Sequence, residues 1–229
     1  MESSVFTPLQ NKVLVALFDR GLADRGYYLT GGTALSAFYL QHRHSDDLDF
    51  FTRKRDPLEK DFRDFQDILT SIGMVITSQD VTGSYARLFA SSENQKGSAL
   101  KLEFARDVPA MMAPPKIHNQ IVVDSFEDIA VNKVCTILSR TFEVKDFCDL
   151  FFILTESRYE LDYLIGRARE KEAAFDEEEG ILAFATNLLT VAEFELLPQM
   201  IKSISLEYLR RYFVPIAEDL IHRLRPTGG

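Results

Sequence analysis

The hydrophobic pattern of this chain changes once, and that change constrains the fold more than any other feature of the sequence. Up to about residue 105, short runs with strand-like alternation are interspersed with segments of helical period, whereas the apolar runs after residue 124 have helical spacing. A connector containing prolines, residues 106–120, lies between the two parts. The pattern predicts an α+β fold in which a mixed β-sheet lobe with flanking helices, residues 1–120, precedes an all-helical C-terminal lobe, residues 121–229.

The bulk composition predicts an ordinary globular protein. Of 229 residues, 46% are hydrophobic and 27% are charged, which excludes a disordered or fibrous class. Charges interrupt every apolar run well short of the roughly 20 residues that a membrane span needs. The N-terminus lacks the basic start and long apolar run of a secretion signal. We therefore expect a cytoplasmic protein with no membrane partner.

The net charge of −9 argues against a protein that coats nucleic acid without sequence preference, because such binding depends on Lys and Arg neutralising phosphates. A locally basic groove remains compatible with the sequence, although charge clusters are commonly solvated faces. The candidate basic residues follow the aspartates of the central strand or lie near the C-terminus: Arg53, Lys54, Arg55, Arg210, Arg211, Arg223 and Arg225.

Two aspartates alternate with apolar residues in the segment "DDLDFF". Because strand side chains alternate, Asp47 and Asp49 project from one face and Leu48 and Phe50 from the other, which separates the carboxylates by about 6 to 7 Å. The two carboxylates repel each other, so we expect positive charge between them. Hard oxygen ligands without His or Cys favour Mg²⁺ or Mn²⁺ over zinc. The alternative is an edge strand whose outer face is solvated.

A glycine pair precedes the aspartates in "TGGTAL", between a predicted strand and a predicted helix. Gly31 and Gly32 let backbone N–H groups approach an anion at the start of the helix. Together with the Thr33 hydroxyl, they could hold a triphosphate beside Asp47 and Asp49. A lone glycine pair is usually only a tight turn, so the prediction depends on the conjunction with the aspartates.

A third carboxylate is common in sites where two metal ions assist phosphoryl transfer. Glu103, in the strand-like segment "KLEF", fits this role because it alternates with Leu102 and Phe104. Pairing with Lys101, or exposure to water, is the alternative for Glu103.

The helical half contributes three further charged residues. Lys133 falls inside the apolar stripe of its predicted helix, so its ammonium either extends to water or meets an anion. Asp146 and Asp149, in "KDFCDLFF", lie away from the apolar face of the next helix. By itself, that position predicts a solvated side.

Taken in order, the segments "LTGGTALSAFYLQHRHSDDLDFF", "KLEF" and "EDIAVNKVCTILSRTFEVKDFCDLFFI" resemble the AbiEii/AbiGii toxin family of nucleotidyltransferases. That family belongs to the DNA polymerase β-like nucleotidyltransferase superfamily. The resemblance spans residues 27–154. It implies a nucleotidyltransferase-type lobe followed by a helical lobe, with NTP and Mg²⁺ bound between them.

The resemblance also implies roles for individual residues. It implies that Asp47, Asp49 and Glu103 take part in metal binding and catalysis. The identity of the general base stays open, because the third carboxylate of the wider superfamily is commonly Asp. The resemblance gives Lys133 and Asp146 to catalysis. The residues implied to bind the nucleotide are Gly31, Gly32, Thr33, Arg43 and Lys133.

The expected activity is transfer of a nucleoside monophosphate from NTP to an acceptor hydroxyl. In the resembling family the acceptor, where assigned, is RNA such as the 3′ end of tRNA, and a cognate antitoxin restrains the activity. Two alternatives remain from the sequence: a nucleotidyltransferase acting on a small molecule or a protein, and a non-catalytic nucleotide-binding module.

Overall fold

The computed structural model describes residues 5–92, 99–139 and 143–224. The chain divides into two compact units. The sheet unit comprises Met1–Tyr39 and His44–Ser125, and the helical unit comprises Leu40–Arg43 and Phe126–Gly229. The α+β class predicted from the sequence is confirmed by the mixed seven-stranded sheet and its accompanying helices.

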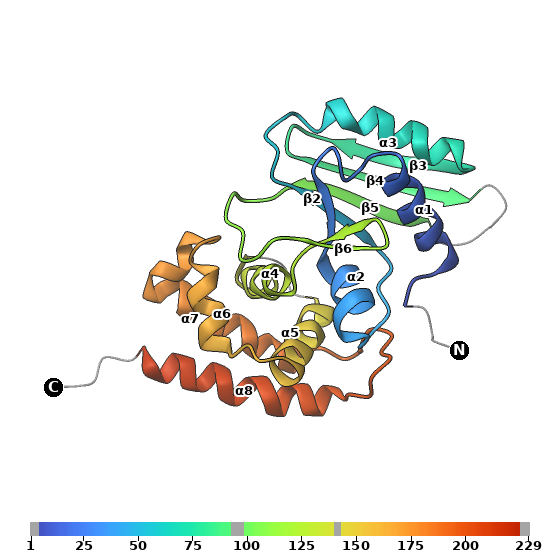
Figure 1. Cartoon of the computed structure of the whole chain (residues 1–229). Helices are drawn as coiled ribbons and strands as arrows, with labels where there is room; N and C mark the ends of the chain where they lie inside the picture. The colour runs from blue at the N-terminus through green and yellow to red at the C-terminus, as the bar shows by residue number, and fades with distance from the viewer. Residues whose placement is uncertain (1–4, 93–98, 140–142, 225–229) are drawn as a thin grey trace. The chain divides into compact units, whose positions relative to one another are not determined.

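The sheet unit is built on strands in the order β3-β4-β5-β2-β1-β7-β6 (Figure 1). The central strand β2 pairs antiparallel with β1 and parallel with β5, so the sheet is mixed. The elements are α1 (Pro8–Asp19), β1 (Tyr27–Thr30), α2 (Gly31–Leu35), the π-helix η1 (Ser36–Leu40), β2 (Leu48–Thr52), α3 (Glu59–Ser71), β3 (Met74–Val81), β4 (Tyr85–Ser92), β5 (Leu100–Arg106), β6 (Lys116–His118) and β7 (Ile121–Val123).

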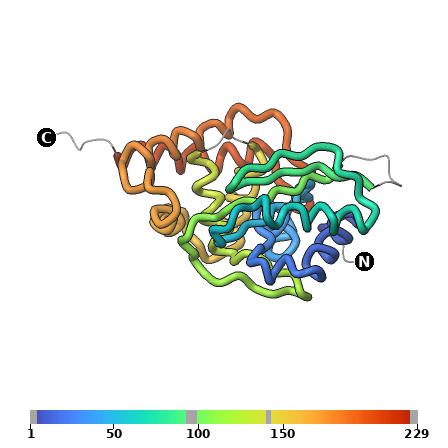
Figure 2. Tube along the Cα trace, turned by 90° about the horizontal axis from the view of Figure 1, so that it is seen from above, coloured from blue at the N-terminus to red at the C-terminus, as the bar shows by residue number. Residues whose placement is uncertain are grey.

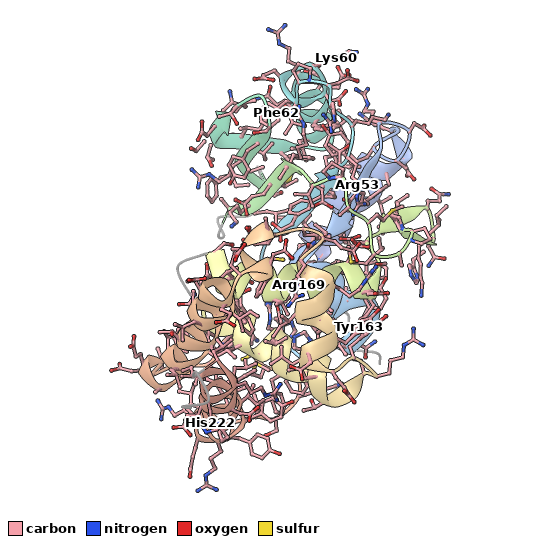
Figure 3. The ribbon with its side chains drawn as sticks, turned by 90° about the vertical axis from the view of Figure 1, so that its left-hand side faces the viewer. Arg53, Lys60, Phe62, Tyr163, Arg169 and His222 are labelled. Atoms are coloured by element: carbon pink, nitrogen blue, oxygen red, sulfur yellow. The ribbon has the colours of Figure 1, made fainter. Side chains whose placement is uncertain are left out.

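An aromatic core fixes the orientation of the central strands. Phe104 of β5 stacks on Phe50 of β2 at 5.0 Å and on Phe65 of α3 at 4.7 Å between ring centroids. Phe18 of α1 lies 6.3 Å from Phe50, so α1 and α3 cover the same face of the sheet. On α3, Phe62 is buried in this core, whereas Lys60 extends into solvent (Figure 3). Because strand side chains alternate, residues between these aromatic positions project from the opposite face.

Two short strands lie where the sequence pattern showed none. β6 falls inside the segment interpreted as a connector, and β7 falls inside the part assigned to the helical lobe. β7 pairs parallel with β1 and antiparallel with β6, so the sheet continues beyond residue 120. The boundary between the two compact units lies after Ser125, and the earlier segment Leu40–Arg43 also belongs to the helical unit.

The helical unit contains α4 and α5 followed by a succession of shorter helices and the long α8. Figure 2 shows α7 running alongside α8, with which it makes direct contact. Among the described residues, no helix is long and apolar enough to cross a membrane. The elements are α4 (Phe126–Ser139), α5 (Val144–Glu156), α6 (Leu161–Ala168), η2 (Ala173–Asp176), α7 (Glu178–Leu189), η3 (Thr190–Glu193) and α8 (Leu206–Arg223).

Candidate active site

Three carboxylates gather at the two central strands of the sheet unit, two of them on the strands and one just before β2. Asp49 of β2 lies directly opposite Glu103 of β5 in the parallel ladder, and Asp47 precedes β2. Both strands turn their large apolar residues toward the aromatic core, which directs Asp49 and Glu103 to the other face. The structure therefore brings together the acidic residues that the alternation of the two segments selected.

Lys101 places a positive charge between Asp47 and Glu103 rather than between the two aspartates, and its contact with Glu103 is the pairing given as the alternative for that residue. Its Nζ lies 2.9 Å from Asp47 Oδ2 and 2.9 Å from Glu103 Oε2. Partial burial lowers the pKa of Lys101, but the two carboxylates outweigh burial and raise it above its ordinary value. About a quarter of each of the three side chains is exposed, at 25%, 26% and 23%, so solvent reaches this acidic cluster.

Tyr85, the first residue of β4, completes the surroundings of Glu103. Its hydroxyl donates a hydrogen bond to Glu103 Oε1. Burial raises the pKa of Glu103, but hydrogen bonds from Tyr85 and Lys101 outweigh burial and lower that pKa below its ordinary value. Burial and the contact with Glu103 raise the pKa of Tyr85 to about 12. At neutral pH, Glu103 is therefore a carboxylate and Tyr85 a protonated donor. The sequence carried no signal for Tyr85, because only the β4–β5 pairing brings it here.

The glycine turn between β1 and α2 positions both aspartates. Gly31 has φ +70°, and a Cβ at this position would lie 2.3 Å from Asp49 Oδ2. Only glycine leaves room for the Asp49 carboxylate in this backbone conformation. The buried Thr33 hydroxyl donates a hydrogen bond to the backbone carbonyl of Asp47. These contacts give the turn a positioning role, and phosphate binding by Gly31, Gly32 and Thr33 stays a prediction.

Replacing Gly31 with alanine is expected to slow nucleotidyl transfer about 100-fold, because the new methyl group displaces the Asp49 carboxylate by an ångström or more. The measurement is the initial rate of label transfer from NTP. Gly73→Ala is the matched control, since Gly73 also has a positive φ, +75°, but no atom lies within 4 Å of a Cβ built there. Equal rates for the two variants would contradict this positioning role.

A buried charge cluster lies wholly within the helical unit. Lys133 of α4 places its Nζ 2.7 Å from Asp146 Oδ1 and 2.6 Å from Asp149 Oδ2, both on α5. Burial lowers the pKa of Lys133, but the two carboxylates outweigh it and raise the pKa. Lys133 thus meets an anion, which was one of the two outcomes expected. The predicted solvated side of α5 is wrong, because Asp146 is 7% exposed and Asp149 is 0% exposed.

Asp149 is the centre of this cluster. Arg43 donates to both of its oxygens, with Nε 2.6 Å from Oδ1 and Nη2 2.8 Å from Oδ2, and His42 Nε2 lies 2.7 Å from Oδ1. Burial alone would raise the pKa of Asp149, but Lys133 and Arg43 hold it well below its ordinary value. The ion pair between Arg43 and Asp149 anchors residues 40–43 to α5, and it engages the guanidinium that the resemblance implies to bind the nucleotide.

The predicted site residues thus form two clusters. Gly31, Gly32, Thr33, Asp47, Asp49 and Glu103 lie in the sheet unit, and Arg43, Lys133 and Asp146 lie in the helical unit. The assignment of Arg43, Lys133 and Asp146 to the nucleotide or to catalysis stays a prediction.

Three of the candidate basic residues, Arg53, Arg211 and Arg223, pair with acidic side chains, whereas Lys54 donates a hydrogen bond to the backbone carbonyl of Asp24. Arg53, which follows β2 (Figure 3), lies 2.8 Å from Asp107 and stacks over the Tyr28 ring at 4.9 Å. Arg223 pairs with Asp162 and Asp219. Arg211 pairs with Glu207, Arg210 donates to a backbone carbonyl, and Arg225 lies outside the described residues.

The acidic cluster has the donor chemistry that a hard divalent cation prefers, namely carboxylate oxygens without nitrogen or sulfur ligands. Within residues 5–92, 99–139 and 143–224, no group of three or more His, Cys, Asp or Glu side chains is arranged to hold a metal ion. Asp47 and Glu103 are arranged around the Lys101 ammonium instead. The residues therefore fit a divalent cation by type, with Lys101 standing between two of them.

The mixed sheet with carboxylates on adjacent central strands belongs to a nucleotidyltransferase, as the match to a family model shows. The family model described as "Nucleotidyl transferase AbiEii toxin, Type IV TA system" matches residues 12–215, so the chain belongs to the AbiEii family of toxin–antitoxin systems. The chain is also 29% identical over 169 residues to the uncharacterized protein aq_aa25 of Aquifex aeolicus (strain VF5), which covers 73% of this chain and 76% of that protein.

Solved structures share the fold. A Helicobacter pylori protein provisionally assigned as a nucleotidyltransferase superposes with a TM-score of 0.60 at 20% identity, covering 94% of this chain and 93% of that one. MenT4, a nucleotidyltransferase toxin from Mycobacterium tuberculosis H37Rv, superposes with a TM-score of 0.53 at 14% identity, covering 95% of this chain and 92% of that one.

Proposed function

We propose that this nucleotidyltransferase moves a nucleoside monophosphate from NTP to a hydroxyl of RNA, such as the 3′ end of tRNA, in a reaction that depends on Mg²⁺ or Mn²⁺. Asp47, Asp49 and Glu103 would hold the cation. The observation that carries the proposal is the pairing of Asp49 with Glu103 across β2 and β5, with Asp47 joined to Glu103 through Lys101.

In the proposed reaction, the acceptor hydroxyl oxygen attacks the α-phosphorus of NTP. The bond from that phosphorus to the bridging oxygen breaks, pyrophosphate leaves, and the hydroxyl proton passes to a base. Glu103 is ionised at neutral pH and Tyr85 fixes its orientation, but its lowered pKa makes it a weak base, which suits a ligand of the cation better than a general base. A bound divalent cation would supply neutralisation of the phosphate charge.

The protein's own groups contribute chiefly positioning and electrostatics, as is general for phosphoryl transfer. Gly31 and Thr33 hold Asp49 and Asp47 in place through their contacts at the glycine turn. Membership of a toxin family implies a cognate antitoxin, and an RNA acceptor accounts for growth inhibition by a nucleotidyltransferase.

A second candidate acceptor is a small molecule or a protein side chain. Two observations favour it: the net charge of −9, and the pairing of Arg53, Arg211 and Arg223 with acidic side chains. An RNA-binding surface gains from unpaired basic residues, because they neutralise phosphates. Transfer to RNA should therefore depend on salt more steeply than transfer to a small molecule.

Incubation of the purified protein with each α-labelled NTP, bulk RNA and Mg²⁺ is expected to place label in RNA, and EDTA is expected to abolish the transfer. The rate at subsaturating RNA is expected to fall steeply as salt rises. Free NTP without RNA serves as the blank. Label transfer in EDTA would contradict the metal dependence. Label found only in protein or small molecules would show that the acceptor is the second candidate and not RNA.

A further inference from the structure

Lys101 occupies the position between two of the proposed metal ligands. It lies two residues before Glu103 on the same face of β5, and its ammonium contacts one oxygen of Glu103 and one of Asp47 at 2.9 Å each. The two carboxylates belong to different parts of the sheet unit: Asp47 precedes β2, and Glu103 lies on β5. One ammonium therefore ties the end of the loop before β2 to β5.

The acidic cluster needs such a cation. Three carboxylates on adjacent strands repel one another, and partial burial strengthens the repulsion. One lysine offsets part of this charge and fixes the side chains of Asp47 and Glu103.

A divalent cation would compete for the same oxygens. Magnesium holds its oxygen ligands at about 2.0 to 2.1 Å, which is closer than the 2.9 Å at which Lys101 holds them. The ammonium and a dication at one pair of oxygens would also repel each other. The Lys101 side chain is 25% exposed and unbranched, so it can leave toward solvent.

We infer that Lys101 is a built-in counter-ion, which holds Asp47 and Glu103 in the metal-free protein and is displaced when a divalent cation binds. The inference rests on the metal site of the proposed function. It makes Lys101 a positioning residue that weakens binding of the free cation. If Lys101 is a counter-ion, its replacement should strengthen metal binding. If Lys101 only supported the structure of the site, its replacement should weaken metal binding.

The test is calorimetric titration of Mn²⁺ and of Mg²⁺ into the wild-type protein and into Lys101→Met, without nucleotide. Lys101→Met is expected to bind Mn²⁺ about tenfold more tightly, because the competing charge is gone. Lys101→Arg keeps the charge and is expected to bind as the wild type does. Lys60→Met on α3 is the matched control, since it makes the same charge change at an exposed residue, and its affinity is expected to stay unchanged.

A second readout uses thermal stability. In EDTA, Lys101→Met is expected to melt below the wild type, and saturating Mn²⁺ is expected to raise its midpoint by more than that of the wild type. Lys101→Gln serves the same comparison should the methionine variant fail to fold. Adding Asp47→Asn to Lys101→Met is expected to remove the gain in affinity, which locates the binding.

The outcomes separate the two proposals. Wild-type binding with equal or weaker binding by Lys101→Met overturns the counter-ion role and leaves the metal site intact. A lack of binding by every protein overturns the metal site and the counter-ion role together. Tighter binding by Lys101→Met that survives Asp47→Asn also overturns the counter-ion role, because the cation would then lie elsewhere.

Discussion

Replacing Asp149 with alanine is expected to lower the free energy of unfolding by about 3 to 5 kcal/mol. Asp149 is fully buried, and its carboxylate is the shared partner of Arg43 and Lys133. Its removal takes from Arg43, which is only 2% exposed, the carboxylate that accepts hydrogen bonds from two of the three guanidinium nitrogens, Nε and Nη2. The loss is large because the cost of removing the Arg43 charge from water is no longer offset by the Asp149 carboxylate.

Urea unfolding followed by circular dichroism measures this effect. Glu156→Ala is the matched control on the same helix, because Glu156 pairs with Lys202 at a partly exposed position. That pair is expected to contribute no more than about 1 kcal/mol. A loss for Asp149→Ala as small as that of the control would show that the buried cluster does not stabilise the fold.

The same variant should change the pH dependence of stability. The pKa of Asp149 is depressed in the folded protein, so its contribution is fully present above the unfolded value of about 3.9 and is lost as pH falls toward the folded pKa. The difference between the wild type and Asp149→Ala is therefore expected to be constant from neutral pH down to about pH 5 and to narrow below about pH 4.

Much of the fold was predictable because its signals are local. The alternation in "DLDFF" and "KLEF" predicted β2 and β5, and helical period predicted α4 and α5. β6 and β7 were missed because strands of three residues are too short to show alternation. They form because β1 offers an edge to pair with, which is a property of the assembled sheet.

The same division applies to the candidate site. Alternation was sufficient to select Asp47, Asp49 and Glu103, since it fixes which face each side chain takes. The contact of Tyr85 with Glu103 depends on strand pairing and could not be read from spacing.

The burial of Asp149 could not be predicted for a related reason. The arginine that neutralises Asp149 comes from Leu40–Arg43, a segment far away in sequence. The pattern of a single helix predicts that a charged residue away from the apolar face is exposed to solvent, because the pattern contains no information about a partner from another segment.

Replacing Asp49 with asparagine is expected to reduce the rate of nucleotidyl transfer about 10²- to 10³-fold, the usual cost of removing one electrostatic group from a phosphoryl-transfer or acyl-transfer site. Asn has nearly the shape of Asp, so the packing of the side chain against Gly31 is retained while the charge is lost. The neighbouring Asp46 is exposed and provides the matched control, Asp46→Asn.

The most direct test of the central claim, that the carboxylates on β2 and β5 form the catalytic centre, is the single-turnover rate of label transfer from NTP by these two variants in Mg²⁺. Both are first shown to fold by circular dichroism. A catalytic centre at these strands predicts a rate within a few-fold of the wild type for Asp46→Asn and a loss of about 10²- to 10³-fold for Asp49→Asn. Transfer by Asp49→Asn at the rate of Asp46→Asn would contradict it.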